Sequence, residues 1–218
     1  MPDILRIAAV LLTTALLSGC GANTADYSTI GTRTPTTTSA DPGETSARPV
    51  PIAEYLNSVG VTGQQVPLDE LTDLTVTLPR PPGWTKYANP NFSPGTEAIA
   101  KNNTYPTAMV MVFKLSGNFD VAKALEHGDD SAELSKDFKR LNYSTDDFDG
   151  FPSAMVEGSY DLEGTRLHTY NRIVIPVTPE PEFQRYLVQF TVTTRADKAA
   201  AQAPEVQQVI EGFTVKVT

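Results

Sequence analysis

The sequence predicts an α+β fold in which a single antiparallel β-sheet is flanked by helices. Segments with strand-like patterns follow one another along the chain with short connections, so neighbouring strands are expected to run antiparallel. Segments with the apolar spacing of helices are grouped between these strands and do not alternate regularly with them. Residues 52–218 form the predicted globular domain, and a domain of this length buries about 70% of the surface of its unfolded chain.

The domain is predicted to begin with a helix and two strands. Residues 52–59 have apolar side chains on one helical face, and Gly60 suits the position that follows a helix C-terminus. Residues 74–78 alternate between apolar residues and threonine, which is typical of a strand. Residues 108–115 are an apolar run of strand length, which indicates a central strand covered on both faces.

A helical region and a hairpin are predicted next. Residues 119–141 have helical spacing with a break at residues 128–130. The residues expected to face inward are Val121, Leu125, Leu134, Phe138 and Leu141. Residues 154–161 and 166–177 have strand patterns, and the short glycine-containing connection between them predicts a β-hairpin.

The C-terminal part is predicted to complete the sheet and to add a helix. An exposed, proline-rich turn at residues 178–182 leads into a third strand of the meander, residues 185–194. Residues 196–210 have helical spacing, although Pro204 is expected to delay the start of this helix or to kink it. Residues 213–217 then close the chain as a strand.

The first nineteen residues have the features of a bacterial lipoprotein signal peptide. Arg6 precedes an apolar run, residues 7–17, which is long enough for a secretory leader and too short to span a bilayer. Residues 17–20 (Leu-Ser-Gly-Cys) match the lipobox, in which a diacylglyceryl group is joined to the cysteine and the leader is removed before it. We therefore expect Cys20 to be the lipidated residue. The alternative is a conventional leader with an incidental cysteine.

A tether is predicted between the lipid and the domain. Residues 20–51 are dominated by Thr, Ser, Ala, Pro and Gly, and they show no hydrophobic periodicity. Such a segment cannot bury enough apolar surface to offset the entropy of ordering, so it is expected to be disordered and to hold the domain away from the membrane. Its threonine-proline stretches suit either O-glycosylation or a bare spacer.

Net charge and cysteine content exclude several classes of function. The net charge of -9 is unfavourable for binding nucleic acid or for lying electrostatically on anionic lipid. Membrane attachment must therefore come from acyl chains, typically including a palmitate on the amino group, and each buried methylene contributes about 0.8 kcal/mol. These features predict a protein on the outer face of the bacterial plasma membrane. They leave open whether it is also shed or exposed at the cell surface.

No recognisable catalytic or metal-binding set appears in the sequence, so neither an enzyme nor a cofactor is predicted. The two histidines, His127 and His168, lack the spacing of metal ligands, and structural or surface roles are expected for both. No nucleophile elbow or phosphate-binding glycine loop occurs. The acidic segment 144–150 suits a turn, or an incomplete calcium loop.

One region has the composition of a sugar-binding site. Aromatic rings can stack on a pyranose, and amide groups can bond its hydroxyls. The candidate binding residues are Trp84, Tyr87, Asn91, Asn103 and Tyr105. The alternative interpretation is that Trp84 caps the core and that the asparagines belong to loops.

Several of these features, taken in order, resemble the LpqN/LpqT family of mycobacterial lipoproteins. They are the lipobox and tether, the helix at residues 52–59 leading into Gly-Val-Thr-Gly at residues 60–63, the strand at residues 74–78 followed by Pro-Pro-Gly-Trp at residues 81–84, and Gly-Phe-Thr-Val at residues 212–215. The resemblance implies a fold like the Mog1/PsbP group. Only Cys20 carries over as a functional residue.

The resemblance also implies a non-enzymatic protein of the cell envelope. The first hypothesis is a lipoprotein that binds an envelope glycolipid of the trehalose mycolate type, or assists its export together with the export proteins. The alternative is a protein-interaction adaptor, or a surface antigen sensed by host receptors through its acylated N-terminus. A third hypothesis is a hydrolase that uses paired carboxylates at Asp147 and Asp149.

Overall fold

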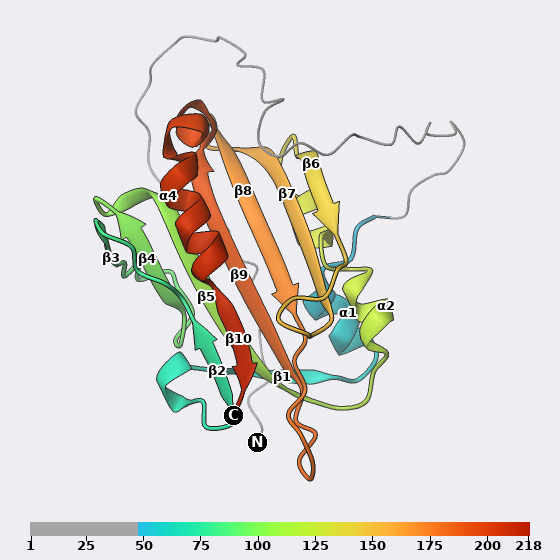
Figure 1. The fold of residues 1–218 in the computed structure, drawn as a ribbon. Helices are drawn as coiled ribbons and strands as arrows, with labels where there is room; N and C mark the ends of the chain where they lie inside the picture. The colour runs from blue at the N-terminus through green and yellow to red at the C-terminus, as the bar shows by residue number, and fades with distance from the viewer. Residues whose placement is uncertain (1–47) are drawn as a thin grey trace.

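The fold is built on one large antiparallel sheet (Figure 1), shown by a computed structural model that describes residues 48–218. The sheet has eight strands. Seven of them lie side by side in the order β3-β4-β5-β9-β8-β7-β6, and the eighth, β1, also pairs with β5. Its strands are β1 Thr62–Val66, β3 Trp84–Lys86, β4 Glu97–Lys101, β5 Thr104–Ser116, β6 Lys139–Ser144, β7 Ser153–Leu162, β8 Thr165–Val174 and β9 Tyr186–Arg195. A separate two-stranded ribbon is formed by β2 Leu74–Thr77 and β10 Thr214–Val217.

Helices lie on both faces of this sheet. The described helices are α1 Ile52–Ser58, α2 Val121–Leu125, α3 Asp130–Glu133 and α4 Ala199–Gly212, with 3-10 turns at Leu68–Glu70 and Ala196–Lys198. In Figure 1, α4 lies in front of β5 and β9, whereas β8, β7 and β6 extend beyond it without a helix in front of them. Within residues 48–218, no helix is long and apolar enough to cross a membrane.

Two hydrophobic clusters fill the two sides of the sheet. The cluster under α4 and the ribbon includes Phe190 of β9 and Phe213, whose rings stack at 4.1 Å. The cluster on the opposite face joins Leu56 of α1 and Leu125 of α2 to Phe113 of β5. Burying each large apolar side chain of this kind contributes roughly 1.5–3 kcal/mol. Because β5 supplies residues to both clusters, it is the central strand that its apolar run predicted.

Most of the predicted elements are confirmed. The helix at residues 52–58 is present, and Gly60 follows it with φ +81. The β7–β8 hairpin turns through Glu163 and Gly164, which both have positive φ, as a two-residue turn of this type requires. The C-terminal helix also forms, beginning at Ala199 after a 3-10 turn and continuing through Pro204.

The helical prediction for residues 119–141 is wrong in its second half. Only α2 and α3 are helical there, and residues 139–144 form the edge strand β6. Leu134 and Leu141 do not face inward: they are 42% and 52% exposed. The physical reason lies in β7, whose backbone groups would have no partner on this side if β6 did not pair with them.

The expectation of a single sheet also requires a correction. The α+β class is confirmed, but β2 and β10 pair only with each other, in a ribbon beside α4. Their inward residues, including Leu74 and Val215, belong to the same hydrophobic cluster as Val209 of α4. Ribbon and helix therefore form one covering layer on the main sheet.

Candidate functional site

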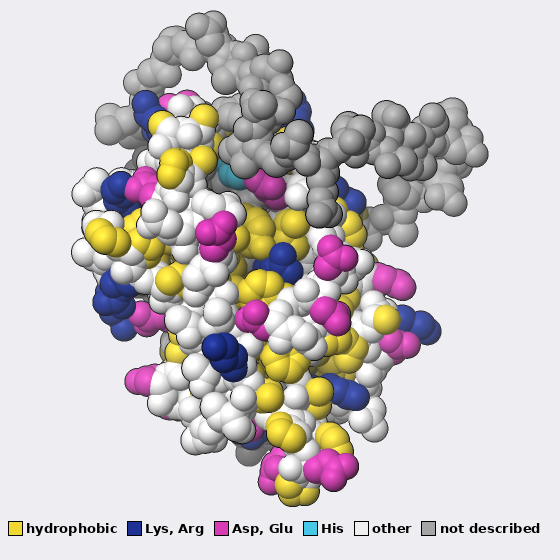
Figure 2. Space-filling model, viewed as in Figure 1, with side chains coloured by type: hydrophobic (Ala, Val, Ile, Leu, Met, Phe, Trp, Pro, Cys, Tyr) yellow, Lys and Arg dark blue, Asp and Glu magenta, His cyan; other side chains and the backbone are white. Residues whose placement is uncertain are grey.

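A groove runs beside α4, where the sheet continues beyond the helix. We call it the α4 groove. It is open to solvent and is lined by Glu157, His168, Tyr170, Val192, Thr194, Ala199, Ala203, Val206, Gln207 and Ile210. Figure 2 shows apolar side chains mixed with charged ones on the surface beside α4.

One wall of the α4 groove is apolar. Ala199, Ala203, Val206 and Ile210 are spaced by four, three and four residues, so they form one stripe along α4. At the rise of an α-helix this stripe is about 17 Å long. Val192 of β9 adds apolar surface. The wall can therefore contact an extended hydrocarbon chain.

The floor of the α4 groove is polar because of the strand register. Glu157 of β7 is paired with Tyr170 of β8, and His168 is paired with Thr194 of β9, so these side chains lie on one face. Glu157 Oε1 and His168 Nε2 are 3.0 Å apart. This contact holds the imidazole and the carboxylate together at the floor.

Thr194 is the one buried residue of the floor with an unused polar group. Its side chain is 2% exposed, and its hydroxyl has no hydrogen-bond partner in the part of the chain that the structure describes. A buried polar group without a partner costs about 1–3 kcal/mol. Because this hydroxyl is closed to a water-sized group, a ligand hydroxyl could reach it only after neighbouring side chains move.

Tyr170 is fixed in place by its neighbours. Arg172 Nε donates a hydrogen bond to the Tyr170 hydroxyl at 2.8 Å, and the Tyr170 ring meets the edge of Phe190. Arg172 is itself held by Ser153 Oγ at 2.9 Å and by the Phe148 ring. Burial raises the pKa of Tyr170, and Arg172 partly opposes this shift. The phenol therefore keeps its proton at neutral pH and can donate it to a ligand.

The structure corrects the predicted role of Trp84. The side chain is 3% exposed and belongs to the hydrophobic cluster under α4. Its ring cannot stack on a sugar from this position, so Trp84 is wrong as a surface binding residue. The alternative interpretation, in which Trp84 caps the core, is confirmed.

The other four candidate residues lie in loops or at the ends of strands: Tyr87 follows β3, and Tyr105 is the second residue of β5. Asn91 is in an exposed turn, where its backbone N–H bonds Asn89 Oδ1. Asn103 has φ +59 in the turn between β4 and β5, a conformation that asparagine tolerates better than most residues. These positions explain both asparagines through turn geometry, in agreement with the loop interpretation.

Tyr87 and Tyr105 are close enough to influence each other. Burial raises the pKa of Tyr105, and the nearby Tyr87 and Glu163 raise it further. Burial also raises the pKa of Tyr160 to about 12, with a contribution from Tyr105. The structure thus brings two of the predicted tyrosines together without Trp84, and their role in binding stays a prediction.

The acidic segment 144–150 is a structural turn. Asp149 Oδ2 accepts a hydrogen bond from the backbone N–H of Val215 at 2.8 Å, which ties the turn to β10. Asp146 is bonded to the hydroxyl of Ser144. Within residues 48–218, no group of three or more His, Cys, Asp or Glu side chains is placed to hold a metal ion.

His127 and His168 differ in their surroundings. His127 stacks on Tyr55 at 4.4 Å and bonds Asp130 at 2.8 Å, so the expected structural role is confirmed. His168, by contrast, lies on the floor of the α4 groove. The sequence offered a signal for this, because residues 166, 168, 170 and 172 are all polar or aromatic on one side of a strand. Cys20 and its lipobox lie outside the described residues.

The antiparallel sheet, the C-terminal helix and the closing ribbon define an α+β domain. Within this class, a family model described as "Probable lipoprotein LpqN" matches residues 48–216. The chain belongs to this lipoprotein family.

Comparisons with individual proteins agree with this assignment. The chain is 50% identical to the putative lipoprotein LpqT of Mycobacterium tuberculosis over 217 residues, which cover 98% of this chain and 95% of that protein. The crystal structure of LpqN, described as involved in cell envelope biogenesis of M. tuberculosis, superimposes with a TM-score of 0.67 at 19% identity, and the match covers 78% of this chain and 99% of that one. The solution structure of PsbP from Synechocystis sp. PCC 6803 is less similar, with a TM-score of 0.42 at 12% identity over 68% of this chain and 94% of that one.

Proposed function

We propose that the protein is a non-enzymatic lipoprotein of the cell envelope whose α4 groove binds a glycolipid of the trehalose mycolate type and assists its export. The observation that carries this proposal is the division of the groove into an apolar wall on α4 and a polar floor on β7, β8 and β9. A glycolipid has the same division between its acyl chain and its sugar. The anchor proposed at Cys20 would hold the domain at the outer face of the plasma membrane.

The polar floor suits a sugar headgroup. Sugar hydroxyls both donate and accept hydrogen bonds, and the floor offers a carboxylate from Glu157, an imidazole from His168 and hydroxyls from Tyr170 and Thr194. The Thr194 hydroxyl is buried, so a ligand would bond it only after a local shift of the side chains that cover it.

The apolar wall can cover only part of one acyl chain. Each methylene removed from water contributes about 0.8 kcal/mol. A groove that is open to solvent and also holds a headgroup can cover only the first part of a long chain. The proposal therefore places the sugar and the adjoining hydrocarbon in the groove and leaves the rest of the chain outside.

The geometry favours binding over hydrolysis. Nucleophilic catalysis requires a hydroxyl within hydrogen-bond reach of its base. No hydrogen bond joins the Thr194 hydroxyl to His168 or to any other described residue. Of the two carboxylates considered for a hydrolase, Asp149 is bonded to the backbone of β10.

A matched pair of substitutions on α4 tests the proposal. Ala203→Phe places a ring in the α4 groove, whereas Ala201→Phe adds the same ring at an exposed position of the same helix. We expect calorimetry to show saturable binding of a short-chain trehalose monoester to the wild-type domain and to Ala201→Phe. Ala203→Phe should weaken this binding by at least tenfold. Equal affinity in all three proteins would contradict the proposal and favour the protein-interaction alternative.

A further inference from the structure

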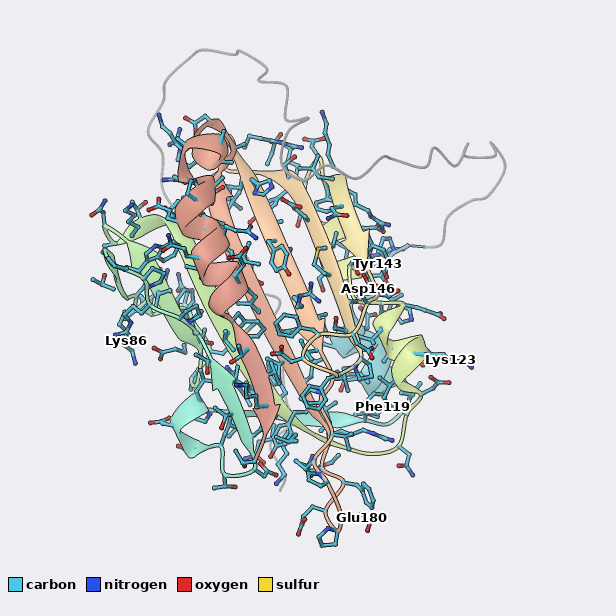
Figure 3. The ribbon with its side chains drawn as sticks, viewed as in Figure 1. Lys86, Phe119, Lys123, Tyr143, Asp146 and Glu180 are labelled. Carbon is cyan, nitrogen blue, oxygen red and sulfur yellow. The ribbon has the colours of Figure 1, made fainter. Side chains whose placement is uncertain are left out.

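The connection between β8 and β9 protrudes from the end of the sheet. We call residues 175–185 the β8–β9 loop. In Figure 1 it extends below the body of the domain, and Figure 3 shows Glu180 at its tip. The two sides of the loop meet in an isolated β-bridge between Val177 and Arg185.

Hydrogen bonds fix the base of this loop. Thr178 N donates to the Gln184 carbonyl, and Gln184 N donates to Thr178 Oγ1, both at 2.9 Å. Gln184 Nε2 donates to the Leu115 carbonyl of β5 at 2.8 Å. The loop also contains three prolines at positions 176, 179 and 181, each of which restricts the backbone. The base of the loop is therefore fixed, and the prolines restrict the backbone of its tip.

The loop exposes apolar side chains that the rest of the fold could have buried. Phe183 is 57% exposed and Val177 is 40% exposed, and Phe183 is the most exposed of the large hydrophobic residues that the structure describes. Phe183 also has φ +45, a conformation that a bulky residue rarely adopts. Its backbone N–H bonds the Pro179 carbonyl at 3.3 Å. The fold thus holds a phenyl ring toward solvent.

The charge around Phe183 is negative. Glu180 and Glu182 are exposed, and neither forms an ion pair with a residue in the described part of the chain. The nearest cation along the chain, Arg185, stacks on the ring of Phe119 at 5.2 Å. A partner approaching the tip would meet an aromatic ring next to two carboxylates.

We propose that the β8–β9 loop is a docking site for a second protein, one with an apolar pocket whose rim carries lysine or arginine. An exposed aromatic side chain on a preorganised loop is the usual kind of anchor in a protein interface, because little entropy is lost on binding. The carboxylates disfavour insertion into an anionic membrane surface, which attracts basic segments. The proposal uses none of the residues of the α4 groove, so this proposal and the proposal of glycolipid binding can fail independently.

Photo-crosslinking of the full chain in a mycobacterial host tests this proposal. p-Benzoylphenylalanine is placed at position 183 in one variant and at Leu141 in a control, because Leu141 is 52% exposed on β6. We expect one discrete protein adduct from position 183 and not from 141. Glu180→Lys with Glu182→Lys should abolish that adduct. Only lipid adducts, equal adducts at both positions, or none would overturn the proposal.

Affinity measurements between the purified full chain and the purified partner identified by crosslinking then test the stated chemistry. Phe183→Ala should weaken binding by at least tenfold, and Glu180→Gln with Glu182→Gln should weaken it severalfold and reduce its salt dependence. Since Phe183 and both glutamates are exposed, unchanged melting temperatures are expected for these variants. A partner that binds Phe183→Ala as tightly as wild type would overturn the proposal.

Discussion

Thr194 shows how a single residue connects stability and binding. Its hydroxyl lies on a central strand, is desolvated and has no described partner. Another buried threonine, Thr178, uses its hydroxyl to accept the backbone N–H of Gln184. The two residues have similar burial, 2% and 4% exposed, and differ in whether the hydroxyl is satisfied. They therefore form a natural comparison.

The first residue-scale prediction concerns these two threonines. Thr194→Val should leave the free energy of unfolding unchanged or raise it by roughly 1 kcal/mol, because an unpaired polar group is removed. The same variant should lose at least tenfold in affinity for a short-chain trehalose ester. Thr178→Val should instead lose roughly 1 kcal/mol of stability and keep that affinity. Urea denaturation and calorimetry measure both quantities, and a large loss of stability in Thr194→Val would contradict this account.

A second prediction at this scale concerns Asp129, which is 5% exposed and paired with Arg140. Burial raises the pKa of Asp129 above its ordinary value of 3.8, more than Arg140 lowers it. The folded state therefore holds this proton to a higher pH than the unfolded state does. The resulting stability is present below pH 3.8 and is lost as pH rises through the raised pKa.

The effect of Asp129 on stability is measured by urea denaturation between pH 3 and pH 6, a range that includes the ordinary carboxyl pKa of about 4. Wild type should lose more stability across this range than Asp129→Asn, in which the position does not titrate. Asp147→Asn is the control, because Asp147 is exposed in the 144–150 turn. Parallel curves for wild type and Asp129→Asn would show that the Asp129 pKa is not raised.

At the scale of elements, the sequence pattern predicted those helices and strands that are determined by local residues. The β7–β8 hairpin, the strand β9 and the helix α4 follow from alternation, turn residues and helical spacing, and all three are present. The edge strand β6 could not be found in this way. The apolar residues at 138, just before this strand, and at 141, within it, also fit helical spacing. Only the need of β7 for a partner decides between helix and strand.

The α4 groove could be predicted only in part. The sequence contained its components: a stripe of small and apolar residues on α4 and a polar face on β8. It did not show that α4 covers β9 and leaves the same face of β8 open, because that follows from packing between distant elements. Trp84 was misassigned for a similar reason, since its aromatic character suits a sugar site and a core equally well.

On the scale of the whole molecule, two surfaces of the domain have different properties. The α4 groove is a recessed surface with apolar and polar sides, whereas the β8–β9 loop is a protruding acidic one. The first suits a small amphiphile and the second suits a protein. A lipoprotein with both surfaces could hold a glycolipid while contacting a component of the export machinery, which joins the two functional hypotheses in one molecule.

The most direct test of the central claim is an NMR titration of the domain with a short-chain trehalose monoester. The account predicts saturable shifts of backbone amides that line the α4 groove, with His168, Thr194 and Val206 among the largest. The residues around Tyr87 and Tyr105 should shift little. Saturable shifts centred on those tyrosines, or none at millimolar ester with a folded domain, would contradict the assignment of glycolipid binding to the α4 groove.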